Sequence, residues 1–335
     1  MSPIPIVRAA HLLLYIDALR ELGEPVDRDL AASRLPGWIE ERPEAYVSLP
    51  LTLDWVAKSN RNVSLPELGY LAARKMSLAT VDSMMEMAVL SAPTTYARIG
   101  VISHLAHRED SALVIRARTE GPNIRIICDM PDFRGTPFFG FAEWLNLGGI
   151  AFLVGAGAGP AWHPEEMTFV CPSPQCDAAL DTFGRTRILS GQPYSSLLVT
   201  SEVFARSNLL LADAEGTQPP LEEIANEWNF VSTLRSVLRP YVGGQAPTLA
   251  LAAEISGMSG RTLQRRLARS GLSYSQVLEE TRFEIARDML AVRETKIVDV
   301  AMASGYENPQ NFSRAFRRIA GMAPKTYRRM ATDIV

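Results

Sequence analysis

The sequence predicts an α+β N-terminal domain followed by an all-α domain that holds two tandem helix-turn-helix units joined by a long helix. Strand-like alternation is confined to the middle of the chain, and none follows residue 221. The last third repeats itself, because Ala253 and Gly257 recur 48 residues later as Ala301 and Gly305. Residues 1–224 carry a net charge of −9, whereas residues 225–335 carry 16 basic and 10 acidic side chains, a net of +6. A basic end beside an acidic one suits binding of a polyanion by the basic end only.

Helices are expected to dominate the first hundred residues. Residues 4–22 have the apolar spacing of a helix, and Gly23 ends the segment. Pro50 and Pro66 suit the first turn of a helix, where a missing N–H costs nothing. Further helices are predicted at 27–34, 50–59, 66–76 and 94–107, with a methionine-rich apolar segment at 76–90.

The middle of the chain changes to strand-like patterns. Residues 111–119 alternate, with Ile115 on one face and Arg116 and Arg118 on the other. Gly121-Pro122-Asn123 forms a turn before a second strand-like segment at 124–130, so the two segments predict a β-hairpin. Beyond the hairpin we expect a helix at 137–154, a strand at 167–171, a helix at 174–183 and a strand within 195–204.

One long apolar run, residues 145–162, raises the question of a membrane span. It contains Asn146 and glycines at 148, 149, 155, 157 and 159, which favour a buried helix that ends in a glycine-rich loop. No membrane association is therefore expected. Cys128, Cys171 and Cys176 lack the spacing of a metal site and suit reduced thiols in a cytoplasmic protein, so neither metal nor cofactor is expected.

The domain boundaries follow from these patterns. Residues 1–212 are assigned to a ligand-sensing or dimerisation domain, and residues 223–335 to a DNA-binding domain. The segment between them, 213–222, is polar and contains two prolines, which is typical of a linker.

The first helix-turn-helix unit is predicted from its caps and its turn. Thr248 and Ser259 can each accept a hydrogen bond at a helix start, and Gly257 permits the left-handed backbone of a tight turn. On the second helix, Leu263 and Leu267 are spaced to face inward. This spacing leaves Arg261, Gln264 and Arg265 outward, and such side chains can form paired hydrogen bonds with guanine or adenine.

The spacer helix and the second unit follow the same logic. Residues 273–276 form a capping box that opens a helix extending to about residue 291. Gly305 makes the second turn, and Asn308 followed by Pro309 is typical of a cap and a first helical position. Phe312 and Phe316 are expected to face inward, which leaves outward Gln310, Asn311, Arg314 and Arg317.

These residues closely resemble the DNA-binding domain of the AraC/XylS family of bacterial transcription regulators. The resemblance covers residues 257–267, 297–306 and 312–318, and continues to Gly321, Pro324, Tyr327 and Arg328. It implies contacts with DNA from both recognition helices, with Pro309 at the start of the second. The expected DNA-binding set is Arg261, Thr262, Gln264, Arg265, Pro309, Gln310, Asn311, Arg314 and Arg317.

The front 200 residues resemble the larger type of AraC-family N-terminal domain, which implies sensing of a small molecule, dimerisation, or both. On the predicted hairpin, Arg116, Arg118 and Arg125 are candidates to clamp an anionic effector, with solvated sheet charges as the alternative. Trp144 and the phenylalanines at 138, 139 and 141 are candidates for an apolar pocket, with core packing as the alternative.

The sequence therefore predicts a sequence-specific transcription regulator, an activator controlled by a small-molecule effector. Its expected partners are double-stranded DNA, RNA polymerase, the effector and a second copy of the chain. A constitutive regulator whose front domain only dimerises is the alternative. An enzyme with a DNA-binding tail is the remote alternative, because the four histidines, His11, His104, His107 and His163, are scattered. No catalytic residue is assigned.

Overall fold

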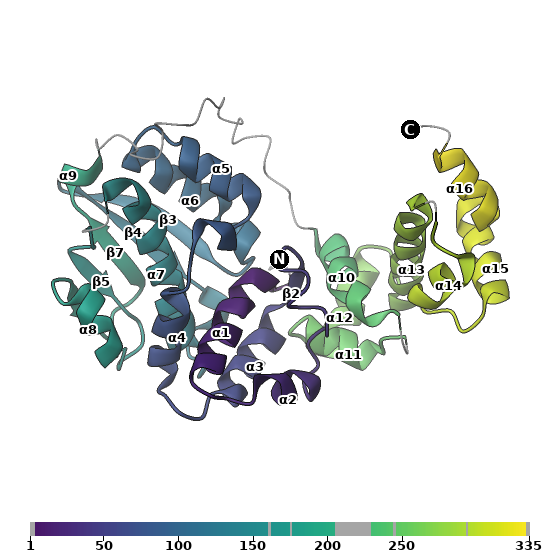
Figure 1. The fold of residues 1–335 in the computed structure, drawn as a ribbon, viewed down its shortest axis with the longest axis horizontal. Coiled ribbons are helices and arrows are strands. Elements are labelled where there is room, and N and C mark those ends of the chain that lie inside the picture. The colour runs from purple at the N-terminus through teal and green to yellow at the C-terminus, as the bar shows by residue number, and fades with distance from the viewer. Residues whose placement is uncertain are drawn as a thin grey trace. The chain divides into compact units, whose positions relative to one another are not determined.

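The computed structural model describes residues 4–159, 162–174, 176–204, 229–243, 246–292 and 294–332. The chain divides into two compact units, residues 5–227 and a unit that contains residues 228–335 (Figure 1). We call these the N-terminal unit and the C-terminal unit. The expected linker, 213–222, lies outside the described residues.

The N-terminal unit begins with a small strand pair and four helices. Strand β1 (Ile6–Arg8) pairs antiparallel with β2 (Tyr46–Ser48). The helices are α1 (Ala9–Glu21), α2 (Val26–Ala31), α3 (Leu49–Ser59) and α4 (Leu65–Ala73). The expectation of a helix from residue 4 was wrong for residues 6–8. These residues are buried and pair with β2, and three-residue strands are too short to show alternation in the sequence.

A five-stranded sheet occupies the other part of this unit, in the order β3-β4-β7-β5-β6. Its strands are β3 (Val114–Glu120), β4 (Asn123–Asp129), β5 (Glu166–Thr168), β6 (Arg187–Leu189) and β7 (Ser195–Val199). The expected hairpin is confirmed, with Arg118 opposite Arg125 across β3 and β4. Among the described strands of this sheet, β5 pairs with β6 in parallel and the other pairings are antiparallel; the sequence did not predict β6.

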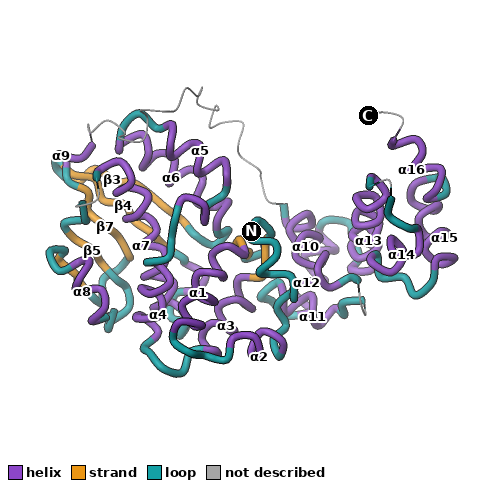
Figure 2. Tube along the Cα trace, in the orientation of Figure 1, coloured by secondary structure: helices purple, strands orange, loops and turns teal. Residues whose placement is uncertain are grey.

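Helices cover one face of this sheet. Ile115, Ile126 and Leu197 lie in one apolar cluster with residues of α5 (Ser83–Ser91), α6 (Thr95–Glu109) and the long helix α7 (Phe139–Ala158). Two shorter helices, α8 (Asp177–Phe183) and α9 (Ser201–Phe204), complete the unit. Figure 2 shows the strands of the larger sheet gathered in one part of the unit and α1 to α4 in another.

Helix α7 connects the two parts, because its residues contribute to both apolar clusters. It ends at Ala158 rather than near residue 154, so the glycines at 155 and 157 belong to the helix. Two glycines of this helix pack closely: a Cβ on Gly148 would lie 2.7 Å from the Ala73 side chain, and one on Gly155 would lie 3.2 Å from the Trp162 ring. The helix is apolar enough to cross a membrane by length and composition, but 67% of that stretch is buried inside the protein, as in a core helix.

The C-terminal unit is helical throughout its described residues. Its α-helices are α10 (Phe230–Leu238), α11 (Leu249–Ile255), α12 (Gly260–Arg269), α13 (Tyr274–Ala291), α14 (Ile297–Ala303), α15 (Pro309–Ala320) and α16 (Pro324–Thr332). Val300 and Ala301 of α14 pack with Phe312 and Phe316 of α15 in one apolar cluster. The structure thus has an α+β N-terminal part and a helical C-terminal helix-turn-helix region.

Candidate nucleic-acid interface

The α11–α12 and α14–α15 helix pairs turn in the same way, 48 residues apart. Met258 N–H donates to the Ala253 carbonyl at 2.9 Å, and Tyr306 N–H donates to the Ala301 carbonyl at 3.0 Å. Gly257 and Gly305 adopt φ of 64° and 73°, which only glycine adopts without strain. The sequence repeat is therefore a repeat of backbone geometry. Gly305 has a further constraint, because a Cβ there would lie 2.3 Å from the Val242 carbonyl oxygen.

Helix α12 separates an apolar face from a basic one. The Ser259 hydroxyl accepts a hydrogen bond from Thr262 N–H and so caps the helix, as predicted. Leu263 and Leu267 are 0% and 1% exposed, so the inner face is fixed against the unit's core.

The outer face of α12 carries the predicted DNA-binding side chains. Arg261, Gln264 and Arg265 are all exposed. Neither arginine has a hydrogen bond or ion pair with any described residue, so both guanidinium groups can accept a partner from outside. Thr262 differs from its neighbours because the Ser259 hydroxyl donates to its side-chain oxygen at 3.0 Å. Thr262 therefore belongs in part to the helix cap.

Helix α15 repeats this arrangement with its own local contacts. The Asn308 side chain caps the helix by accepting a hydrogen bond from Asn311 N–H at 2.8 Å, and Pro309 occupies the first helical turn. The Arg314 guanidinium donates to Asn311 Oδ1 at 2.6 Å, so the structure brings two predicted contact residues together.

The remaining predicted residues of α15 differ in exposure. Gln310 and Arg317 are exposed, whereas Pro309 is half-buried. The guanidinium of Arg317 has no hydrogen bond or ion pair among the described residues. Pro309 offers neither a donor nor a flexible side chain, so it can shape the helix start but cannot form hydrogen bonds to DNA.

Other arginines of the C-terminal unit are used internally. Arg235 bridges Glu280 and Glu284 at 3.2 and 2.9 Å and thereby ties α10 to α13. Arg266 lies over the Phe230 ring at 5.4 Å, and Arg282 lies over the Tyr306 ring at 5.1 Å. These contacts hold the helices together and leave α12 and α15 with unpaired outward cations. Local sequence patterns did not predict these contacts, because their partners lie 24 to 49 residues apart.

The predicted effector residues do not converge on one site. Arg116 and Arg118 are exposed on one face of the sheet, and Arg118 contacts the Tyr194 hydroxyl at 3.3 Å. Arg125 lies on the same face but is only 7% exposed. It forms an ion pair with Glu166 at 2.9 Å and a hydrogen bond with Ser196 at 3.0 Å. Its charge is already neutralised within the fold.

Trp144 lies in the apolar cluster that covers the other face of the sheet. It is fully buried, its ring packs on Phe169 with centroids 4.7 Å apart, and its N–H donates to the Pro174 carbonyl at 2.7 Å. Phe139 and Phe141 are likewise buried in a core. Trp144 therefore cannot complete a pocket with the hairpin arginines, and it serves as core.

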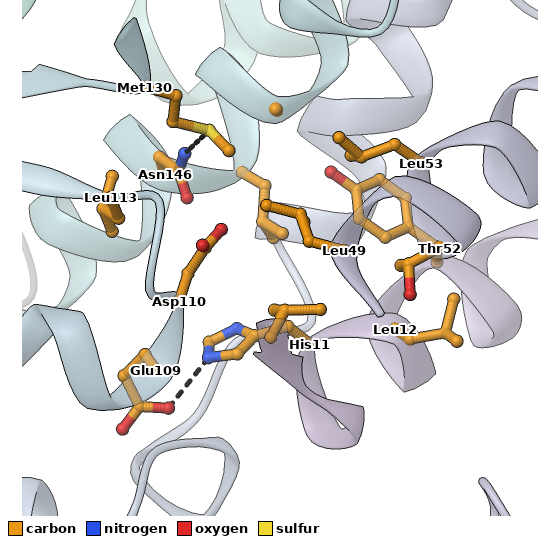
Figure 3. Close-up of a pocket in the computed structure, with 14 residues that line it drawn as sticks. His11, Leu12, Leu49, Thr52, Leu53, Glu109, Asp110, Leu113, Met130 and Asn146 are labelled. Atoms are coloured by element: carbon orange, nitrogen blue, oxygen red, sulfur yellow. Dashed lines mark hydrogen bonds and ion pairs between the residues drawn. The ribbon is translucent and has the colours of Figure 1, made fainter. Parts of the chain in front are cut away.

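A polar cluster lies elsewhere in the N-terminal unit, around a cavity of about 50 Å³ (Figure 3). Figure 3 shows His11 beside Glu109, joined at 2.9 Å, with Asp110 and Asn146 facing the same space. Arg8 also pairs with Glu109, at 3.1 Å. The cavity has room for a few water molecules and is far below the ~300 Å³ or more of small-molecule sites.

The two carboxyl groups of this cluster have opposite pKa shifts. Burial raises the pKa of Asp110 from 3.8 to about 6. Burial also favours the neutral form of Glu109, but its hydrogen bond with His11 and the charges of His11 and Arg8 outweigh burial and lower its pKa. The cluster therefore joins α1 to the end of α6 through a buried, charge-compensated contact.

Comparisons with known proteins agree with the geometry of the C-terminal unit. A family model described as "Helix-turn-helix domain" matches residues 252–330, which include α12, α13, α14 and α15. The ornithine utilization regulator of Pseudomonas aeruginosa is 36% identical over 85 residues, which is 25% of each chain.

Similarity to another regulator extends through the N-terminal unit. The HTH-type transcriptional regulator VirS of Mycobacterium tuberculosis is 26% identical over 339 residues, 96% of each chain. Among solved structures, transcriptional regulator CdpR from Pseudomonas aeruginosa matches 83% of this chain and 90% of its own, with 19% identity and a TM-score of 0.40. The helix-turn-helix match, the ornithine utilization regulator and VirS together connect the chain with DNA-binding transcription regulators.

Proposed function

We propose, from the premise that the chain is a DNA-binding transcription regulator of the AraC family, that α12 and α15 are its two base-contacting helices. One observation carries this proposal. Each helix begins at a side-chain cap beside a glycine turn, buries two apolar residues, and presents outward arginine that the fold does not neutralise. Unpaired arginine on a rigid surface is suited to bases and phosphates.

The first helix supplies direct base contacts in this proposal. Arg261 and Arg265 can each donate two hydrogen bonds to the O6 and N7 atoms of guanine, and Gln264 can pair with adenine. Thr262 bonds with the capping residue Ser259 and contributes to DNA binding by fixing where α12 begins. Because Leu263 and Leu267 anchor the opposite face, these side chains keep a fixed register toward the major groove.

The second helix combines a preordered pair with freer side chains. The Arg314–Asn311 hydrogen bond holds the guanidinium near the helix start before DNA arrives. Gln310 and Arg317 lie on the exposed surface for base or phosphate contacts, and Pro309 sets the entry of the helix. Helix α13 joins the two helix-turn-helix units, so that they can enter successive major grooves about 34 Å apart.

The N-terminal unit gives this regulator its control in our proposal. We infer an activator that works with RNA polymerase in the cytoplasm, and whose N-terminal unit binds a small-molecule effector. Similarity to VirS along 96% of both chains supports a regulator of this two-part kind. An N-terminal unit that only holds two copies together remains the second candidate function, and it predicts DNA affinity that no small molecule changes.

The test of the base-contacting role is quantitative DNA binding with the full chain. Arg265→Ala should weaken binding to a selected duplex by about 1–3 kcal/mol and relax preference at one base pair. The matched control is Arg287→Ala on α13, where Arg287 is exposed and pairs with its neighbour Asp288 at 3.0 Å. Equal binding by Arg265→Ala and the wild type would refute the assignment of α12.

A further inference from the structure

A second cavity of the N-terminal unit is large enough for a small molecule. Its volume is about 590 Å³, and it lies along α7 between the end of α4 and the end of α8. We call it the α4–α7 groove. Volumes of roughly 300–1,000 Å³ are typical of small-molecule sites. The hairpin arginines and Trp144, which the sequence suggested for an effector, do not line it.

Small residues of α7 create the groove. Gly148, Ala151 and Gly155 recur at helical spacing and leave the surface of α7 without bulky side chains on that side, and Gly159 follows directly after the helix. Their size also serves packing, since a Cβ on Gly155 would lie 3.2 Å from the ring of Trp162. The sequence signal was therefore the glycine-rich run, which we had assigned to the end of a helix.

The interior of the groove is mostly apolar, and the hydroxyl groups that line it already have hydrogen-bond partners within the protein. Met76, Phe152 and Trp162 line it, and Phe152 is 37% exposed on a helix that is otherwise mostly buried. Tyr70 and Thr182 are polar, but their hydroxyls satisfy each other at 2.6 Å. The occupant that this lining favours is an apolar molecule.

A single unpaired charge lines the same groove. Arg74, at the C-terminal end of α4, is exposed, and its guanidinium has no hydrogen bond or ion pair with any residue that the structure describes. The neighbouring Lys75 differs, because it pairs with Glu21. A guanidinium beside an apolar surface is complementary to a carboxylate on an apolar body.

We propose that the α4–α7 groove binds an elongated apolar molecule with one anionic head group, whose charge pairs with Arg74. This inference rests on the proposed effector control and names the chemical class of the effector. The chain of the ligand lies along the small residues of α7 and against Phe152. Helix α7 runs through both apolar clusters of the N-terminal unit, so a ligand along it contacts an element shared by both.

The experiment is calorimetric titration of the full-length protein with decanoate below its micelle concentration. Decyltrimethylammonium and decanol test the charge, and benzoate tests the length. Decanoate should bind at least about tenfold more tightly than the other three probes, and each tenfold corresponds to 1.4 kcal/mol. Equal affinity for decanoate and decyltrimethylammonium, equal affinity for benzoate, or no binding of decanoate would overturn the proposal.

Four variants locate the site. Arg74→Gln should weaken decanoate binding at least about tenfold, whereas Arg74→Lys should retain most of it. Ala156→Phe, at a half-buried position in the groove, should block binding while thermal unfolding confirms that the variant folds. Arg116→Gln is the matched control, because Arg116 is exposed and unpaired among the described residues but does not line the groove. Unchanged binding in Arg74→Gln would place the ligand elsewhere.

DNA affinity measured with and without decanoate separates the two proposals. If decanoate binds through Arg74 but leaves DNA affinity and transcription unchanged, the ligand site stands and effector control by it fails. If DNA recognition through α12 stands while decanoate does not bind, the ligand class fails and the DNA-binding function does not. Loss of dimerisation in Ala156→Phe without any decanoate binding would show that a second copy occupies the groove and would overturn the ligand.

Discussion

The N-terminal unit buries several arginines, whereas the C-terminal unit displays the arginines of α12 and α15. Arg98 is fully buried and donates to the carbonyls of Val89 and Val154 at 3.3 and 3.4 Å. Arg8 and Arg125 are 7% exposed and paired with glutamates. Arg261 and Arg265 are exposed and unpaired within the described residues. Arginine side chains thus stabilise the fold of the N-terminal unit, whereas those on α12 of the C-terminal unit are available to a ligand.

This difference predicts where substitutions will act. A buried charge whose partner is removed costs several kcal/mol of folding free energy, whereas an exposed, unpaired arginine contributes little to folding. Changes in the N-terminal pairs should therefore lower stability, and changes on α12 or α15 should lower DNA affinity alone. Arg74, like Arg116, is exposed within the N-terminal unit, and its position in the lining of the α4–α7 groove is what connects Arg74 with a ligand.

The largest effect is expected at the buried Arg8–Glu109–His11 cluster. Glu109→Ala leaves Arg8 and His11 without their carboxylate and also removes the acceptor of Asp82 N–H, at 2.7 Å. It should lower the free energy of unfolding by about 3–5 kcal/mol in urea titration. Glu44→Ala, at an exposed position, is the control and should change it by less than about 0.5 kcal/mol. Equal stability of the two variants would show that the cluster is not a structural contact.

Asp110 in the same region should make stability depend on pH. Its pKa is about 6 in the folded protein and 3.8 when unfolded, so the folded state binds the proton more tightly. The contribution of Asp110 to stability should therefore fall as pH rises from about 4 through about 6, by up to about 3 kcal/mol. Asp110→Asn lacks this titration, and Asn can still accept from Ala112 N–H. In urea titrations, the free energy of unfolding of Asp110→Asn minus that of the wild type should increase as pH rises from about 4 to about 6. A difference that does not change with pH would contradict the buried position of Asp110.

Two glycines of the C-terminal unit give a matched pair with a smaller effect. Gly305 and Gly321 both have φ of 73°, but only Gly305 has a neighbour within 4 Å of an added Cβ, the Val242 carbonyl oxygen. Gly321→Ala should cost about 1 kcal/mol from backbone strain, and Gly305→Ala should cost more because the chain must also move. Thermal unfolding compares them, and an equal loss would mean that the Val242 contact relaxes freely.

The smallest effect is expected from one outward arginine of α15. Arg317→Ala should leave unfolding unchanged and weaken binding to all duplex sequences by a similar factor, if Arg317 contacts phosphate. The slope of log affinity against log salt should then fall by about 1. A change in sequence preference instead would show that Arg317 contacts a base. A loss of stability would break the contrast between the two units.

Local features of the C-terminal unit were predictable because their causes lie within a few residues. The caps at Ser259 and Asn308 depend on a side chain and an N–H three residues on, and both are confirmed. The turn at Gly257 requires only a positive φ. Such requirements can be recognised from residue types a few positions apart in the sequence. The outward position of Arg265 likewise follows from the inward leucines at 263 and 267.

Features of the N-terminal unit that depend on distant partners were not predictable. Arg125 looked available for a ligand, but Glu166 neutralises it from 41 residues away in the chain. The glycine-rich run predicted that the helix ends near residue 154, but the helix continues to Ala158, and Trp162 packs 3.2 Å from the Cβ position of Gly155. Strands β1, β2 and β6 were not predicted, although β5, which also has three residues, was.

The most direct test of the account is selection of bound duplexes from a random pool by the full-length protein at physiological salt. If α12 and α15 both contact bases, the recovered motif should contain two short elements whose centres are about 10 base pairs apart. Arg265→Ala should relax preference at one base pair of one element and leave the other element intact. A single element, no enrichment, or a motif that Arg265→Ala selects unchanged would contradict the central claim that the exposed arginines of the C-terminal unit read DNA.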